Sequence, residues 1–287
     1  MQRSLIGLVL AFCWTLTATA GGLSEENSTR LAKVLKAQPE ELQARYPSRH
    51  PQQTLEFFGI EPGMTVVEVL PGRGWYSPIL VSYLGSDGML IGADYRLEIW
   101  PNFSFGTPEY IARKRAWVEE WPATAAEWKG EDGASARAVR IGNIPDDLDG
   151  TADAVLFVRA MHNLSRFESE GGFRSAALED TMAVLKPGGV VGIVQHEAPA
   201  GTPDTWADGS RGYLNKDTLI KQMKAAGFEY VGSSAVNNNP ADVPGESDIV
   251  WRLPPSLMTS RNDPEKRAEY EAIGESNRMT LLFRKPA

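Results

Sequence analysis

Four short apolar runs, each followed by turn residues, constrain the fold of this 287-residue chain more than any other feature. None of them shows the apolar–polar alternation of a half-exposed strand, so we expect strands buried on both faces of a parallel sheet. Helical stretches at 77–84, 108–121 and 174–185 lie between them, and strands that alternate with helices predict a doubly wound α/β fold. The four runs span residues 65–69, 89–93, 154–158 and 190–194.

Three weaker strands, at 138–141, 230–233 and 279–284, bring the predicted sheet to seven strands. We expect the Lys-Pro-Gly-Gly sequence at 186–189 to form a turn before the fifth strand, and Asn215 to cap a helix that ends at Gly227. The stretch 237–276 is rich in Pro, Asn and Asp and carries one charged helix at 264–273. We interpret it as a surface excursion. The predicted fold is therefore a Rossmann-like, doubly wound, mostly parallel seven-stranded sheet with helices on both faces.

The first 20 residues have the pattern of a secretory signal peptide. Arg3 precedes a short apolar run, and Ala18-Thr19-Ala20 is a small-x-small cleavage site. We therefore expect a signal peptide at 1–20, a helical arm at 21–50, one domain at 51–287, and an exported, periplasmic protein. Cys13, the only cysteine, would leave with the signal, so we expect a mature chain without disulfides.

Charge and hydropathy narrow the class of partner. The net charge is −8 and no basic cluster interrupts the acidic balance, which argues against a nucleic-acid partner. No later apolar stretch is long enough to cross a bilayer, so we expect no stable membrane insertion after signal cleavage. A small molecule or a cell-envelope component is the expected substrate, and the sequence leaves the oligomeric state open.

The strongest functional motif is a strand, a glycine turn and a helix in succession. The first strand runs into Gly72 and Gly74, where the missing side chains let a ligand approach the backbone, and a helix start follows. Asp94 closes the second strand. An acid at that position of a doubly wound fold accepts both ribose hydroxyls of a nucleotide cofactor. Together these features indicate a nucleotide-type site, whereas a glycine pair by itself also makes an ordinary tight turn.

With these motifs the chain resembles the class I S-adenosylmethionine-dependent methyltransferases, in particular an exported bacterial group of predicted methyltransferases. The resemblance spans residues 52–286. It is carried by Pro62-Gly63-Met64-Thr65-Val66-Val67-Glu68, Pro71-Gly72-Arg73-Gly74-Trp75-Tyr76, Met161-His162-Asn163, Leu185-Lys186-Pro187-Gly188-Gly189, Ala226-Gly227-Phe228, Asn239-Pro240-Ala241-Asp242 and Phe283-Arg284-Lys285-Pro286.

The resemblance implies S-adenosylmethionine as cofactor and a set of contacts for it. Glu68 would lie beneath the methionine end of the cofactor, with Pro71, Gly72 and Gly74 against it. Asp94 would hold the ribose and Asn143, after the third strand, would contact adenine. One position departs from the family pattern, because Leu70 stands where the first glycine of the motif belongs.

Two histidines follow neighbouring strands of the predicted sheet. His162 and Asn163 come after the fourth strand, and His196 and Glu197 after the fifth. Because these strand ends share one edge of the sheet, both imidazoles are candidates for a catalytic base, although a structural hydrogen-bonding role is as well supported. Tyr76 and Asn163 are candidate substrate contacts. Imidazole and carboxylate also ligate metals, but this spacing matches no metal motif, so we predict none.

Six aromatic residues crowd the segment after the second strand, where they either wall a pocket or, as we prefer, seal the core. Tyr110 and Lys114 have the spacing of a dehydrogenase Tyr-x-x-x-Lys pair but follow the glycine turn too closely for that role. The six aromatic residues are Trp100, Phe103, Phe105, Trp117, Trp121 and Trp128.

Three functions remain open from sequence. The first is methyl transfer from S-adenosylmethionine to a small molecule or envelope component. The second is non-catalytic S-adenosylmethionine or nucleotide binding on the same fold, which the altered glycine turn and export from the compartment that makes this cofactor both favour. The third is a nicotinamide-dependent oxidoreductase, against which the Lys-Pro-Gly-Gly segment and the closing strands argue.

Overall fold

One seven-stranded sheet runs through residues 22–287, the part of the chain that the computed structural model describes. The strand order is β3-β2-β1-β4-β5-β7-β6. Only β7 runs against its neighbours, because β5–β7 and β6–β7 are antiparallel and the other pairs are parallel. The predicted seven-stranded, mostly parallel Rossmann-like fold is confirmed. The strands are β1 (Thr65–Val69), β2 (Met89–Tyr95), β3 (Ser135–Ile141), β4 (Ala152–Val158), β5 (Leu185–His196), β6 (Glu229–Ser234) and β7 (Arg278–Arg284). The predicted signal peptide at 1–20 lies outside the described residues.

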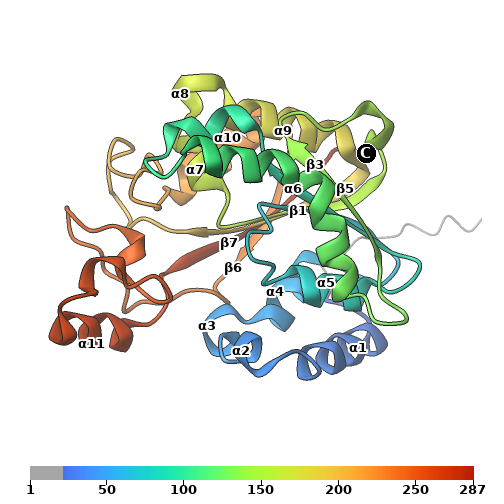
Figure 1. Cartoon of the computed structure of the whole chain (residues 1–287), viewed down its shortest axis with the longest axis horizontal. Coiled ribbons are helices and arrows are strands. Elements are labelled where there is room, and N and C mark those ends of the chain that lie inside the picture. The colour runs from blue at the N-terminus through green and yellow to red at the C-terminus, as the bar shows by residue number, and fades with distance from the viewer. Residues whose placement is uncertain (1–21) are drawn as a thin grey trace, which may run out of the picture.

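Helices cover both faces of the sheet, with α1–α4 below it and α7–α10 above it in Figure 1. The helices are α1 (Glu25–Lys36), α2 (Glu40–Gln43), α3 (Tyr46–Arg49), α4 (Pro51–Phe58), α5 (Ser77–Leu84), α6 (Pro108–Glu127), α7 (Met161–Arg166), α8 (Glu168–Gly171), α9 (Phe173–Val184), α10 (Lys216–Ala225) and α11 (Pro264–Ile273).

The sheet divides the hydrophobic core in two. Val67 and Val69 of β1 pack toward α7, α9 and α10, whereas Val66, which precedes them, packs toward α1, α4 and α5. Successive side chains of a strand point to opposite faces, so a strand covered on both sides is apolar on both of them at most positions. Burying each such side chain contributes about 1.5–3 kcal/mol. This explains why the sequence runs lack alternation.

The N-terminal arm packs onto the domain through α1. Ser24 caps this helix by accepting a hydrogen bond from the Asn27 N–H at 3.1 Å, and acidic residues follow in the first turn. Leu31 and Leu35 of α1 are buried in the same core cluster as α4 and α5. The arm therefore shares the core of the domain, and its separate limits at 21–50 stay a prediction.

One local prediction is wrong, and a second is confirmed in position only, because Asn215 is the N-cap residue of α10 without a side-chain capping bond. Residues 186–189 are part of β5 itself, where Ala152 of β4 pairs with Leu185 but Ala154 pairs with Val190, so the extra residues bulge out of the ladder. Asn215 precedes α10, but its side chain makes no capping bond to the helix. It donates instead to the Thr202 carbonyl at 2.9 Å and to Asp204 at 2.6 Å, so it holds the preceding loop.

The stretch 237–276 is more than a surface excursion. Its helix α11 lies as predicted, but the segment also buries an ion pair between Asp242 and Arg252, with Nη2–Oδ1 at 2.8 Å. Tyr213 donates its hydroxyl to the same carboxylate, and Asn239 donates to the carbonyls of Ile273 and Glu275. These bonds fix both ends of the segment. The Asn-Pro-Ala-Asp sequence therefore has a structural role. We call the bonds made by its Asn239 and Asp242 side chains the clasp.

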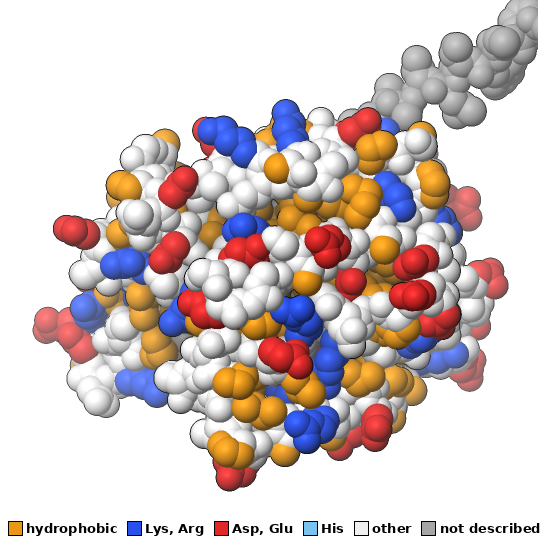
Figure 2. All heavy atoms as spheres, turned by 90° about the horizontal axis from the view of Figure 1, so that it is seen from above, with side chains coloured by type: hydrophobic (Ala, Val, Ile, Leu, Met, Phe, Trp, Pro, Cys, Tyr) orange, Lys and Arg blue, Asp and Glu red, His pale blue; other side chains and the backbone are white. Residues whose placement is uncertain are grey.

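The surface mixes charges of both signs. On the face in Figure 2, acidic and basic side chains are interspersed with hydrophobic ones, and no continuous basic stripe crosses it within the described residues. Among residues 22–287, no helix combines the length and the apolarity that a membrane span requires.

Candidate functional site

The turn after β1 carries three left-handed residues, Leu70, Gly72 and Gly74, with φ of +56°, +62° and +75°. For glycine this backbone is unstrained, but for Leu70 it costs about 1–2 kcal/mol. The Leu70 N–H donates to the Ala93 carbonyl of β2 at 2.8 Å, which fixes the bend. Strain of this kind clusters at functional sites.

The two glycines of the turn have different surroundings. A side chain built on Gly72 would meet no atom closer than the Leu70 carbonyl oxygen at 3.8 Å, so a ligand has room beside it. A side chain on Gly74 would collide with the Trp128 ring, at 2.5 Å. Gly72 therefore fits a cofactor cradle, whereas the missing side chain of Gly74 makes room for Trp128. A cofactor contact by Gly74 or by the buried Pro71 stays a prediction.

Glu68 lies in β1 just before this turn and is buried. Its carboxylate accepts a hydrogen bond from the Ser77 hydroxyl at 2.6 Å, which ties β1 to the start of α5. Burial raises the pKa of Glu68 to about 7, although the bond from Ser77 opposes the rise. The side chain is therefore ready to exchange a proton near neutral pH.

Asp94 lies at the end of β2, as predicted, but it already has a partner. Its side chain is 1% exposed, and one carboxylate oxygen accepts from the Lys114 ammonium of α6 at 2.9 Å. The other oxygen accepts from the Tyr95 N–H at 3.0 Å. A carboxylate has about four acceptor sites, so lone pairs remain for the two hydroxyls of a ribose. Asp94 therefore has the chemistry of a ribose ligand, but it would share that role with Lys114.

Lys114 was not predicted as a site residue. Its ammonium pairs with the Asp94 carboxylate and also lies 4.3 Å from the centre of the Trp100 ring. The Tyr-x-x-x-Lys spacing arises because Tyr110 and Lys114 are one helical turn apart and both pack on Trp100. Nothing in the sequence pairs Lys114 with Asp94, because that contact depends on how α6 packs against the end of β2.

Asn143 lies in the turn after β3 and is exposed. Its backbone N–H donates to the Arg140 carbonyl at 3.1 Å, and the next residue, Ile144, donates to the Asp180 carboxylate of α9 at 2.8 Å. The turn is therefore held in place while the amide side chain is accessible. Adenine contact by Asn143 stays a prediction.

The structure brings the two predicted histidines together. The rings of His162 and His196 lie 5.7 Å apart, centre to centre. Ser276 lies 2.6 Å from Nδ1 of His196, and the Gln195 amide oxygen lies 3.4 Å from Nδ1 of His162. Residues 161–163 begin helix α7 and are not a strand end, as β4 stops at Val158. Glu197 faces away from the pair because successive side chains alternate.

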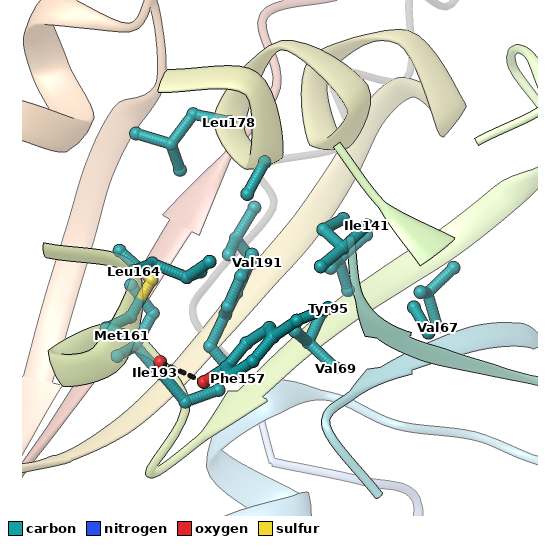
Figure 3. Packing of buried hydrophobic residues seen from close by; sticks show 14 of the residues in the cluster. Val67, Val69, Tyr95, Ile141, Phe157, Met161, Leu164, Leu178, Val191 and Ile193 are labelled. Carbon is teal, nitrogen blue, oxygen red and sulfur yellow. Dashed lines mark hydrogen bonds between the residues drawn. The ribbon is translucent and has the colours of Figure 1, made fainter. Parts of the chain in front are cut away.

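The loop between β4 and α7 is anchored from β2. The Tyr95 hydroxyl donates to the Ala160 carbonyl at 2.5 Å, and Figure 3 marks this bond within the core around Phe157 and Met161. Tyr95 is fully buried, so its bond to Ala160 fixes the position of the backbone just after β4. This fixes the start of α7 and with it the imidazole of His162.

Both imidazoles are neutral at pH 7. Burial, above all, lowers the pKa of His162 to about 4, and the nearby positive charges of Arg159 and Arg166 add to the effect. Burial also lowers the pKa of His196, as do His162 and three arginines. Neutral imidazoles accept hydrogen bonds, but a pKa near 4 makes His162 a weak base at neutral pH.

The low pKa of His162 predicts a loss of stability in acid. The unfolded chain binds a proton at this imidazole near pH 6.5 but the folded chain only near pH 4, so stability falls as the pH drops through that window. We expect this residue to cost about 3 kcal/mol by pH 4. Proton NMR of the ring C–H signals checks it, and a titration midpoint near 6.5 for His162 would contradict the assignment.

The two predicted substrate contacts come from different elements, one before α5 and the other in α7. Tyr76 follows the glycine turn and is buried, with its ring 4.8 Å from that of Trp75, and Asn163 in α7 is half-buried. The six aromatic residues after β2 divide between the two faces of the sheet and mostly seal the core, with Phe105 exposed. Their packing in two core clusters agrees with the preferred core interpretation.

Sequence reasoning missed a set of arginines at the same edge. Arg45 and Arg49 flank the short helix α3, Arg159 follows β4, and Arg278 begins β7. Three of them contact Glu275, which precedes β7. Arg159 directly precedes the motif around His162, but the residues that join it come from parts of the sequence over 100 residues away.

A metal site was not predicted. Within residues 22–287 no three His, Cys, Asp or Glu side chains gather as ligands. Two hollows, of about 580 and 530 Å³, lie away from the histidines, between α9 and α10 and beside Trp206.

No protein-family model matches the sequence, and no curated protein matches it. Among solved structures it is similar to a SAM-dependent methyltransferase from Aquifex aeolicus, with 20% identity over 72% of this chain and 93% of that one and a TM-score of 0.46. A putative methyltransferase from Bacillus halodurans is 14% identical over 83% and 100%, with a TM-score of 0.49. The [4+2]-cyclase SpnF is 16% identical over 84% and 81%, with a TM-score of 0.48. Likenesses this distant carry no information on activity.

Proposed function

We propose that this protein is an exported S-adenosylmethionine-dependent methyltransferase that acts on a small molecule or a cell-envelope component. The observation that carries the proposal is the arrangement at one edge of the sheet. An open left-handed glycine at Gly72, the acid Asp94 and the buried carboxyl of Glu68 lie at the ends of β1 and β2. The neutral His162 follows β4, and the neutral His196 is the last residue of β5 in the same sheet.

Each of these residues has a task that follows from its surroundings. When bound, S-adenosylmethionine supplies a methyl group that its sulfonium has already activated. Gly72 leaves the backbone open to the cofactor, and Asp94 accepts hydroxyl donors. His162, held by Gln195 and the start of α7, accepts a hydrogen bond from the nucleophile of the acceptor and orients it. Orientation of the two reactants is the main contribution that such a transfer needs.

Replacing Asp94 with alanine is expected to weaken binding of S-adenosylhomocysteine at least a hundredfold. Two hydrogen bonds to a charged carboxylate are worth about 3 kcal/mol or more, and 1.4 kcal/mol is a factor of ten. Calorimetric titration measures the change. Asp147→Ala is the matched control, because Asp147 is exposed and pairs only with the exposed Arg137 among the described residues. An Asp94→Ala variant with unchanged affinity would overturn the ribose assignment.

A non-catalytic binding protein is the second candidate, because Lys114 lies on Asp94 and His162 is a weak base. Titrations with S-adenosylmethionine, S-adenosylhomocysteine and NADH separate the alternatives. Binding of the first two supports either candidate, and NADH alone supports an oxidoreductase. The methyltransferase and the non-catalytic binding protein are then separated by incubating the purified protein with periplasmic extract and methyl-labelled cofactor. Mass spectrometry detects a labelled product that depends on the added protein only if the protein is an enzyme. His162→Gln is expected to keep cofactor binding and lower turnover.

A further inference from the structure

Four arginines and one glutamate form a cluster at the edge where β4, β5 and β7 meet. We call Arg45, Arg49, Arg159, Arg278 and Glu275 the arginine cluster. Glu275 is bonded to Arg45, to Nε of Arg49 at 3.2 Å and to Nη1 of Arg278 at 3.0 Å. Arg278 also donates to the Ser48 carbonyl, so the cluster joins the N-terminal arm to β7.

The cluster holds more positive than negative charge. Four guanidinium groups share one carboxylate, which leaves three positive charges uncompensated within it. Burial lowers the pKa of Arg49 to about 9 and of Arg159 to about 10, and the neighbouring arginines contribute, so both stay protonated at neutral pH. The adjacent His162, His196 and Tyr76 are neutral. Uncompensated charge of this kind is costly to bury unless an anion pairs with it.

Arg159 is the member with unused donors. Its guanidinium makes no hydrogen bond or ion pair with residues 22–287, although the residue is mostly buried and its backbone is left-handed, with φ of +58°. The buried Nε of Arg278 also lacks a partner within those residues. Two guanidiniums with free N–H groups are suited to a carboxylate or phosphate, whose oxygens they bind in pairs.

The position of these donors indicates which molecule carries the anion. Arg278 of β7 is paired with His196 of β5, and the Arg159 N–H donates to the Val194 carbonyl of β5 at 2.7 Å, two residues before His196. The positive charge of Arg159 accordingly lowers the pKa of both histidines. Asp94 and Asn143 lie at the other half of the sheet edge, on β2 and after β3. An anion at Arg159 therefore lies beside the histidines and away from the predicted adenosine site.

We propose that Arg159 and Arg278 bind an oxyanion, a carboxylate or a phosphate, of the methyl acceptor and so hold it against His162 and His196. That the ligand is a methyl acceptor rests on the proposed function, whereas the anion site itself does not. The class of acceptor is thus a small acid or a phosphorylated compound.

The anion site is tested with inorganic phosphate and with acetate, against chloride at equal ionic strength. We expect each to raise the melting temperature of the wild-type protein, and Arg159→Gln to weaken the apparent affinity at least tenfold. Arg159→Lys keeps the charge but loses the paired donors, so we expect it to be intermediate. Arg267→Gln is the control, as Arg267 is exposed and pairs only with Glu271 within residues 22–287. Equal responses of wild type, Arg159→Gln and Arg267→Gln would overturn the site.

Cofactor titrations distinguish a failure of the proposed acceptor site from a failure of the proposed function. S-adenosylhomocysteine has a methionyl carboxylate and methylthioadenosine lacks it, so we expect Arg159→Gln to bind both as the wild type does. Loss of S-adenosylhomocysteine alone would assign the anion to the cofactor and overturn the acceptor site. Phosphate binding at Arg159 in a protein that binds neither adenosyl compound would keep the anion site and refute the proposed function.

Discussion

Replacing Glu275 with glutamine is expected to lower the free energy of unfolding by about 3–5 kcal/mol at neutral pH. Glu275 is 7% exposed and is the one carboxylate bonded to Arg45, Arg49 and Arg278. Without its charge these guanidiniums stay buried beside Arg159 with no counter-ion among the described residues. Urea denaturation followed by circular dichroism measures the change. The control is Glu271→Gln, an exposed pair with Arg267, for which we expect less than about 1 kcal/mol.

The pH dependence of this effect has a definite sign. Burial raises the pKa of Glu275, but Arg49, Arg278 and Arg45 outweigh it, so the pKa lies below its usual value. The contribution of the carboxylate is therefore complete above about pH 4.3, the unfolded value, and is lost as the pH falls through the folded pKa. The stability gap between wild type and Glu275→Gln should shrink in that acid range. A gap that does not change with pH would contradict the ion-pair explanation.

Replacing Asp242 with asparagine is expected to cost about 3 kcal/mol. Its carboxylate pairs with the buried Arg252, accepts the Tyr213 hydroxyl at 3.1 Å and accepts the Asn277 N–H at 2.9 Å. Asparagine keeps the shape but removes the charge, so Arg252 keeps its longer ion pair with Asp248 at 3.3 Å and its hydrogen bond to the Tyr213 hydroxyl at 3.2 Å. Thermal and urea unfolding measure the loss.

A double-mutant cycle separates the ion pair from the rest of the clasp. Arg252→Met is expected to be destabilising alone, and the double variant Asp242→Asn/Arg252→Met to cost less than the sum, because neither charge is then left buried without a partner. Additive losses would show that the two side chains act independently. Because this clasp positions Glu275 and Ser276 next to His196, we also expect the Asp242→Asn variant to lose phosphate affinity.

The fold was predictable because its strands are buried on both faces. A strand such as β1 is apolar at most positions, with the buried Glu68 as an exception, and that pattern is visible in the sequence without any knowledge of its neighbours. Helices α5 and α11 also begin and end at the predicted residues. The prediction of a turn at the Lys-Pro-Gly-Gly segment was wrong because a β-bulge and a turn use the same residue types.

The sequence by itself determined the α/β class, the glycine bend with Asp94 at the next strand end, and the meeting of His162 with His196. The α/β class follows from strands that alternate with helices. The other two results follow because the chain leaves parallel strands at one shared edge of the sheet. Only the tertiary structure decided that Lys114 contacts Asp94, that Trp128 fills the space beside Gly74 and that three arginines bond to Glu275. Those contacts join segments up to 230 residues apart, and they depend on helix packing and side-chain burial, which no local pattern encodes.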